Sequence, residues 1–166
     1  MLLADVLYKK DLTRDDLIYL LSLTDADEMQ ALYDRAYEVK AANVGRVVYY
    51  RGLIEFSNRC IKNCLYCGIR RDNDEVERFD TDRDDILAMA KWAYDNQYGS
   101  LTLQSGERQD EAFIDYIEGL VRDIKALSHG ELGITLCVGE QDEAAYRRWF
   151  EAGAHRYLLR IETSNP

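Results

Sequence analysis

Three cysteines lie within one short segment of this chain, CIKNCLYC, which spans residues 60–67. Cysteine thiolates are the usual ligands of iron–sulfur clusters and are also common ligands of zinc. A [4Fe–4S] cluster normally takes four cysteines, so three thiolates would leave one iron free to bind a substrate or cofactor. The C-x3-C-x2-C spacing of Cys60, Cys64 and Cys67 therefore predicts an iron–sulfur site with an open position.

Two other interpretations of these cysteines stay open at this point. A structural zinc site usually takes four ligands in two close pairs, and the two histidines of the chain, His129 and His155, lack that spacing. Buried cysteines without a ligand are common singly, but they do not require this spacing. The fourth cysteine, Cys137, lies apart in a predicted strand, where it is either a packing residue or part of a cavity wall.

The composition is acidic, with 21 Lys and Arg against 31 Asp and Glu and a formal net charge of -10. Phosphate groups are held by clustered basic residues, so we expect neither nucleic acid nor an anionic membrane surface as a partner. The first residues, MLLADVLYKKDLTRDD, show no signal peptide, and no apolar stretch approaches the length of a membrane span. We therefore expect a cytoplasmic protein with reduced thiols.

The chain is expected to divide into a helical extension, residues 1–45, and a β/α segment, residues 46–166. Two helices are predicted in the extension from the spacing of its apolar residues. The expected strands are 46–57, 100–106, 133–139 and 155–162, and the expected helices begin at Thr81 and span 109–127 and 142–152. Strand–helix–strand units of this length indicate an α/β fold with a parallel sheet.

Each predicted strand has one apolar and one polar face, because side chains alternate between the faces of a sheet. In 155–162, for example, Arg156, Arg160 and Glu162 share a face opposite Tyr157. The apolar face fits a layer of helices, whereas the polar face predicts a cavity where an ordinary (β/α)8 barrel is packed with aliphatic side chains. Because a closed barrel takes about eight strands and roughly 250 residues, we expect the N-terminal part of a TIM-type barrel in a truncated chain.

The cysteine motif after the first predicted strand resembles that of the radical S-adenosylmethionine (SAM) superfamily. Four segments, given in chain order, further resemble the HydE family of [FeFe]-hydrogenase maturases: GLIEFSNRCIKNCLYCGIRRDN, LQSGE, ITLCVGE and RYLLRIETSNP. The resemblance covers most of residues 46–166. It implies an enzyme that uses a [4Fe–4S] cluster to cleave SAM to methionine and a 5′-deoxyadenosyl radical, acting in maturation of the hydrogenase H-cluster.

The resemblance also implies roles for individual residues. Cys60, Cys64 and Cys67 would bind the cluster. The residues that would contact SAM are Tyr66 beside the adenosyl group, Gln104, Ser105, Gly106 and Glu107 at the methionine amino group, and Thr135 and Glu162 from the third and fourth strands. Arg156 and Arg160 would be the catalytic residues that line the substrate cavity. For these two arginines an internal ion pair with Glu162 or Glu55 is the alternative.

The implied substrate is a small molecule or an organometallic iron species, and the implied partners are other hydrogenase maturases and an electron donor such as ferredoxin or flavodoxin. Biotin synthase and methylornithine synthase are the alternatives within the superfamily. Biotin synthase needs further cysteines on later strands, and only Cys137 is available here. A non-enzymatic iron–sulfur or zinc module, or an inactive cluster-binding fragment, is the alternative from another class.

Overall fold

The computed structural model describes residues 2–160. The chain divides between Val48 and Tyr49 into two compact units. The first unit holds three helices, α1 (Leu3–Leu7), α2 (Arg14–Leu21) and α3 (Ala26–Val44). The short α1 is not expected from the sequence, because five residues are too few to show a helical repeat. The division predicted between residues 45 and 46 lies close to the boundary between the two units and stays a prediction as a domain assignment.

The two longer helices of the first unit begin at capping residues. The Thr13 hydroxyl accepts a hydrogen bond from the backbone N–H of Asp16, and the Asp16 carboxylate accepts one from the backbone N–H of Thr13. Before α3, one Asp25 carboxylate oxygen accepts from the backbone N–H groups of Asp27 and Glu28. These contacts satisfy N–H groups that have no partner within the first turn of a helix.

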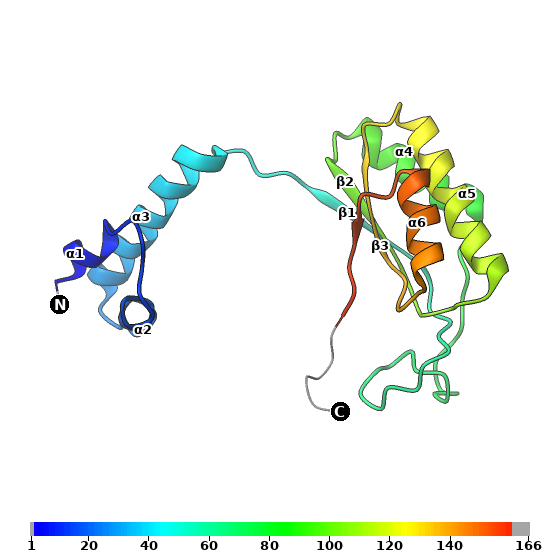
Figure 1. Cartoon of the computed structure of the whole chain (residues 1–166), viewed down its shortest axis with the longest axis horizontal. Coiled ribbons are helices and arrows are strands. Elements are labelled where there is room, and N and C mark those ends of the chain that lie inside the picture. Colours follow the sequence, from blue (N-terminus) through cyan, green and yellow to red (C-terminus); the bar gives the residue numbers. More distant parts are fainter. Residues whose placement is uncertain (1, 161–166) are drawn as a thin grey trace. The chain divides into compact units, whose positions relative to one another are not determined.

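The second unit is a four-stranded parallel sheet in the order β1-β2-β3-β4 with helices between successive strands (Figure 1). The strands are β1 (Arg51–Ser57), β2 (Ser100–Ser105), β3 (Gly133–Cys137) and β4 (Arg156–Tyr157). The helices are α4 (Arg83–Asp95), α5 (Glu111–Leu127) and α6 (Glu143–Ala152). The α/β class and the strand–helix alternation that the sequence predicted are therefore confirmed.

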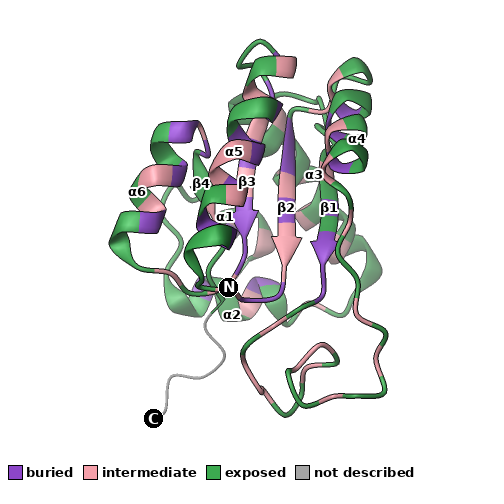
Figure 2. Cartoon of the chain, turned by 90° about the vertical axis from the view of Figure 1, so that its right-hand side faces the viewer, coloured by how far each residue is buried: buried purple, intermediate pink, exposed green. Residues whose placement is uncertain are grey.

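The apolar face of the sheet is buried under these three helices (Figure 2). The apolar positions of the first three strands are buried, among them Ile54, Leu101, Leu103, Ile134 and Leu136, whereas Leu159, expected on the same face of the fourth strand, is exposed. The predicted apolar stripes of α5 and α6 are buried as well, with Trp149 donating its indole N–H to the Ile114 carbonyl at 3.0 Å. The period-two and helical patterns thus identified most of the core of the second unit, whereas in the first unit the apolar positions Leu17 and Leu21 are 46% and 84% exposed.

Strand β1 contains a one-residue offset near its carboxyl end. Its pairing with β2 is regular from Arg51 to Glu55, but the next paired residue is Ser57, so Phe56 is the extra residue. Phe56 remains buried and stacks on Phe113. Offsets of this kind bend a strand and re-aim the residues that follow it, and they occur often beside functional sites. Here the offset immediately precedes the cysteine segment.

Three sequence expectations about element boundaries were wrong. Strand β1 begins at Arg51 and not at residue 46, because its partner strand begins at Ser100, opposite Arg51. Tyr49 and Tyr50, which the expected strand 46–57 includes, precede β1 and are 71% and 74% exposed. Helix α4 begins at Arg83 and not at Thr81, and the side chain of Asp82, the residue that precedes it, makes no capping bond.

The last strand is shorter than the predicted 155–162. Only Arg156 and Tyr157 pair with β3, and the backbone N–H of Leu158 adds one further bond to the Leu136 carbonyl. Residues 161 and 162 lie outside the described part of the chain. Within that part, no helix combines the length and apolar character needed to cross a membrane.

Candidate functional site

The cysteine segment lies in the connection between β1 and α4, at the end of the sheet to which the strand arrows point (Figure 2). In parallel β/α folds this carboxyl end of the strands is where ligands bind. A cavity of about 300 Å³ lies at this end. Its lining residues are Cys60, Lys62, Cys64, Tyr66, Cys67, Ile69, Gln104, Ser105, Gly106, Glu107, Cys137, Gly139, Glu140, Leu158, Leu159 and Arg160.

Most of the residues predicted from the sequence meet at this cavity. The three cysteines, Tyr66, the four residues 104–107 and Arg160 all line it, although they come from three separate segments of the chain. Thr135 and Arg156 are not among its lining residues. Arg156 instead lines a second cavity, of about 350 Å³, with Tyr146 and Trp149. Glu162 lies outside the described residues, so its predicted role stays a prediction.

The first cysteine is held against the segment that follows β2. The Cys60 Sγ accepts hydrogen bonds from the backbone N–H groups of Lys62 and Glu107, both at 3.4 Å. The backbone N–H of Ile61 donates to the Glu107 carbonyl at 2.9 Å. These contacts hold the Cys60 sulfur against the segment that follows β2, at the wall of the cavity.

Gly106 makes this close approach possible. A Cβ atom at this position would lie 2.3 Å from the Arg59 carbonyl oxygen and 2.7 Å from the Cys60 Cβ. No side chain fits there without moving the cysteine backbone. The glycine that the sequence placed in the SAM-binding segment therefore has a direct steric reason in the structure.

The donor set at the cavity fits an iron–sulfur cluster in chemical kind. Three thiols line one cavity, whereas within residues 2–160 no three His, Cys, Asp or Glu side chains gather around a single point as ligands of one metal ion do. Thiolates that bind a cluster need not share one metal ion, because each binds a different iron atom of the cluster. Cys60, Cys64 and Cys67 could thus hold a [4Fe–4S] cluster and leave its fourth iron facing the cavity.

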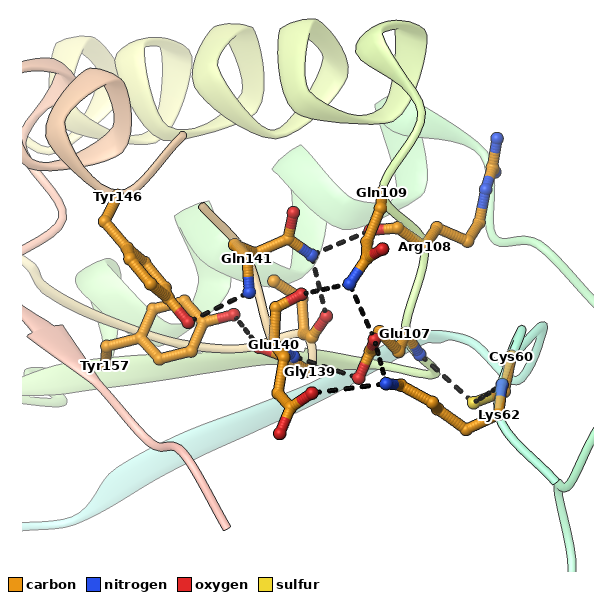
Figure 3. A network of polar contacts seen from close by, with 11 residues as sticks. Cys60, Lys62, Glu107, Arg108, Gln109, Gly139, Glu140, Gln141, Tyr146 and Tyr157 are labelled. Atoms are coloured by element: carbon orange, nitrogen blue, oxygen red, sulfur yellow. Dashed lines mark hydrogen bonds and ion pairs between the residues drawn. The ribbon is translucent and has the colours of Figure 1, made fainter. Parts of the chain in front are cut away.

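A charged network beside the cysteines was not anticipated from the sequence (Figure 3). The Lys62 ammonium lies 3.3 Å from a Glu107 carboxylate oxygen and 3.2 Å from one of Glu140. The carboxylates of Glu140 and Glu107 raise the pKa of Lys62 above its ordinary value. Glu107 itself is only 7% exposed. The buried Glu107 carboxylate therefore already contacts one ammonium group of this chain, and its contact with the amino group of SAM stays a prediction.

The Glu107 carboxylate also connects the segments that follow β2 and β3. It accepts hydrogen bonds from the Gln109 side-chain amide at 2.9 Å and from the backbone N–H of Glu140 at 3.0 Å (Figure 3). Gly139 has a φ of 84°, and a Cβ there would lie 2.4 Å from the Glu107 Cγ. In the sequence, a glycine followed by a glutamate at the end of a predicted strand (Gly106–Glu107 and Gly139–Glu140) was the signal for this site. That pattern did not show that Glu107 contacts Lys62, Gln109 and Glu140.

Cys137 lines the same cavity as the three clustered cysteines but is 7% exposed. Burial raises the pKa of its thiol, and the nearby Arg160 guanidinium opposes that effect only in part. All four cysteines of the chain therefore face one cavity, in two different environments.

We expect Cys137 to resist alkylation in the folded, cluster-free chain. A raised pKa leaves less thiolate at a given pH, so iodoacetamide at pH 8 should modify Cys137 at least about tenfold more slowly than Cys64. Mass spectrometry of timed samples measures the rates. In concentrated urea the two rates should converge, and equal rates in the folded chain would contradict the prediction.

Comparison with known proteins agrees with this site. The sequence profile described as the radical SAM superfamily matches residues 54–166. The chain is 40% identical over 165 residues to the [FeFe] hydrogenase maturase subunit HydE of Thermotoga maritima, covering 99% of this chain and 46% of that protein. It is 29% identical to biotin synthase of Staphylococcus aureus, covering 96% of this chain and 48% of that one. The chain thus spans about half the length of the curated relatives it matches.

Solved structures show the same fold. Methylornithine synthase (PylB) superposes with a TM-score of 0.78 at 26% identity, covering 95% of this chain and 47% of that one. HydG, a maturase of the [FeFe]-hydrogenase, superposes with a TM-score of 0.75 at 22% identity, covering 98% and 36%. The matched profile includes all four cysteines and the whole described sheet except its first three residues. The chain therefore belongs to the radical SAM superfamily.

Proposed function

We propose that this chain forms the cluster- and SAM-binding part of a HydE-type radical SAM enzyme that acts in maturation of the [FeFe]-hydrogenase H-cluster. One observation carries the proposal: three thiols, a buried carboxylate and a glycine-dependent backbone approach meet at a single cavity. The 40% identity to HydE over nearly the whole chain supports the choice within the superfamily. A [4Fe–4S] cluster and SAM are the cofactors that the superfamily uses.

Each part of the cavity then has a task. When bound, the cluster and SAM together supply an electron and a carbon-centred radical. The thiolates of Cys60, Cys64 and Cys67 hold the cluster, and the backbone N–H of Glu107 lies against the first of these sulfurs. The Glu107 carboxylate binds the amino group of the cofactor. Because Lys62 already contacts that carboxylate, the two ammonium groups must share it, with Glu140 as the second acceptor for Lys62.

The remaining predicted residues complete the proposal. Gln104, Ser105 and Tyr66 line the cavity; the first two are proposed to contact the amino group of SAM, and Tyr66 its adenosyl group. Arg160 lines the same cavity and offers a cation to an anionic substrate group. Thr135 and Glu162 are proposed to contact SAM, and Arg156 is proposed to line the substrate cavity with Arg160. Exclusion of water around these groups strengthens their electrostatic interactions.

We further propose an organometallic iron species as the substrate, other hydrogenase maturases as partners and ferredoxin or flavodoxin as the electron donor, in the cytoplasm. The identity to HydE supports this choice. A second candidate is an activity of the methylornithine synthase kind, which the TM-score of 0.78 at 26% identity to that enzyme supports. Both candidates use the same cluster site and differ in the substrate.

Anaerobic reconstitution with iron and sulfide tests the shared part of the proposal. We expect about four irons per chain, the content of one [4Fe–4S] cluster, and an electron paramagnetic resonance (EPR) signal of the reduced cluster that shifts when SAM is added. S-adenosylhomocysteine, which lacks the sulfonium charge, should produce a different shift. Uptake of one zinc per chain with no response to SAM would overturn the proposal.

A further inference from the structure

Arg78 makes an unusual set of contacts beside the cavity. Its guanidinium donates to four backbone carbonyl oxygens within 3.0 Å. The Nη1 group bonds to Asn58 at 2.7 Å and Ile69 at 2.9 Å, and the Nη2 group bonds to Arg70 at 2.6 Å and Asn73 at 3.0 Å. Within residues 2–160 it forms no ion pair with a carboxylate, so backbone carbonyls are its principal partners.

Two of these carbonyl groups lie on either side of the cysteine segment in the sequence. Asn58 lies two residues before Cys60, and Ile69 lies two residues after Cys67. A single nitrogen of Arg78 therefore joins both ends of the segment that carries the three cysteines. Holding the ends of a loop together restricts the conformations open to the residues between them.

A second residue fixes Arg78 in this place. The Asn58 side-chain amide donates to the Glu77 carbonyl at 2.7 Å, and its oxygen accepts from the backbone N–H of Phe79 at 2.9 Å. These two contacts flank Arg78 in sequence. Asn58 is buried at the end of the first strand, so the segment carrying Arg78 is attached to the rigid sheet and not only to the loop.

We propose that Arg78 is a positioning residue that closes the cysteine loop and sets the relative placement of the three cluster ligands. This inference rests on the proposed function for the claim that the cysteines bind an iron–sulfur cluster. The claim that Arg78 joins the two ends of the loop rests on the hydrogen bonds described above. The planar guanidinium has five N–H groups in a fixed fork, which suits it to several carbonyls at once. Without the Arg78 guanidinium, the loop keeps its internal hydrogen bonds, such as that from the backbone N–H of Arg71 to the Lys62 carbonyl. It loses the hydrogen bonds by which Arg78 joins Asn58 to Ile69.

Three variants separate geometry from charge. Arg78→Gln removes the fork, and Arg78→Lys keeps the positive charge with a single nitrogen on a flexible stem. Arg71→Gln is the matched control, because the Arg71 guanidinium lies in the same loop, is exposed and pairs with its neighbour Asp72. The reconstituted proteins are compared by iron content, by the EPR line shape of the reduced cluster and by the rate of iron loss to a chelator.

We expect both Arg78 variants to lose iron to the chelator at least about tenfold faster than the parent chain and to show an altered EPR line shape, whereas Arg71→Gln matches the parent. Lysine should not rescue the glutamine variant, because several carbonyls at fixed positions require the fork. A merely structural role would lower the melting temperature and leave the EPR line shape unchanged. That result, or full rescue by lysine, would overturn the proposal.

A cluster-free measurement distinguishes failure of this inference from failure of the proposed function. Hydrogen exchange of the amides in residues 60–73 should accelerate in both Arg78 variants without any metal present, and not in Arg71→Gln. If the parent chain takes up no cluster but exchange accelerates, the loop closure stands and the proposed function fails. If the parent takes up the cluster and exchange is unchanged, the Arg78 proposal fails alone.

Discussion

Replacing any one of Cys60, Cys64 or Cys67 with serine is expected to abolish stable cluster binding. Iron content after anaerobic reconstitution should fall from about four per chain, the content of one [4Fe–4S] cluster, to near zero. A serine hydroxyl is a poor replacement, because it remains protonated at neutral pH and lacks the soft sulfur that such clusters take as ligand. Iron and sulfide analysis, together with the visible absorption of the cluster, measures the loss.

Cys137→Ser is the matched control for these variants. Its side chain lines the same cavity and the change of atoms is identical, so a general effect of placing serine in the cavity would appear there too. We expect this variant to keep a full cluster. Loss of the cluster from Cys137→Ser together with its retention in Cys64→Ser would show that the ligand set has been assigned wrongly.

Gly106→Ala is expected to displace the cysteine backbone and to destabilise the fold. The added Cβ would lie 2.3 Å from the Arg59 carbonyl oxygen, 2.7 Å from the Arg59 carbonyl carbon and 2.7 Å from the Cys60 Cβ. Two of these are backbone atoms that cannot rotate away as a side chain can. Forced overpacking of this kind typically costs about 1–3 kcal/mol, and here the strain acts directly on the first cluster ligand.

Urea unfolding measures the change in free energy, and reconstitution measures the accompanying loss of iron. Gly68→Ala is the control, because Gly68 also lies close to a cysteine in sequence, but a Cβ added there would meet no atom within 4 Å beyond its chain neighbours. A surface change without new contacts should alter the free energy of unfolding by no more than about 0.5 kcal/mol. Equal stabilities for the two variants would mean that the backbone at Gly106 has room to adjust.

Sequence patterns predicted the parts of the fold that depend on burial. Leu101 and Leu103 alternate with polar neighbours, and Ala145, Trp149 and Ala152 recur at helical spacing, so their direction toward the core follows from the period alone. The start of β1 could not be predicted, because strand length depends on where the partner strand begins. The helix start predicted at Thr81 was wrong because threonine and aspartate satisfy the local rules equally well in a loop.

The cavity likewise contains residues that the sequence could predict and contacts that it could not. The three cysteines lie close together in one segment, and the residues 104–107 are consecutive in another. Each set therefore has a fixed sequence spacing that a motif can represent. The contacts of Lys62 with Glu107 and Glu140 join three separate segments, and no sequence spacing encodes them. Arg78 lies in a run of mixed charges, RRDNDEVERFDTDRDD, whose composition is typical of a solvated loop. Its partners are backbone carbonyls, which leave no trace in residue types.

The offset at Phe56 divides the regular part of β1 from a segment whose side chains no longer follow the alternation of a strand. Up to Glu55, counting residues from Arg51 tells which side of the sheet a side chain faces. Beyond the offset, Ser57 and Asn58 are both buried in succession, so that count no longer applies. Both residues make polar side-chain contacts, including the hydrogen bond that the Ser57 hydroxyl donates to Asp80 at 2.7 Å. The strand therefore packs by alternation up to Glu55, whereas the residues that lead into the cysteine segment are held by polar contacts.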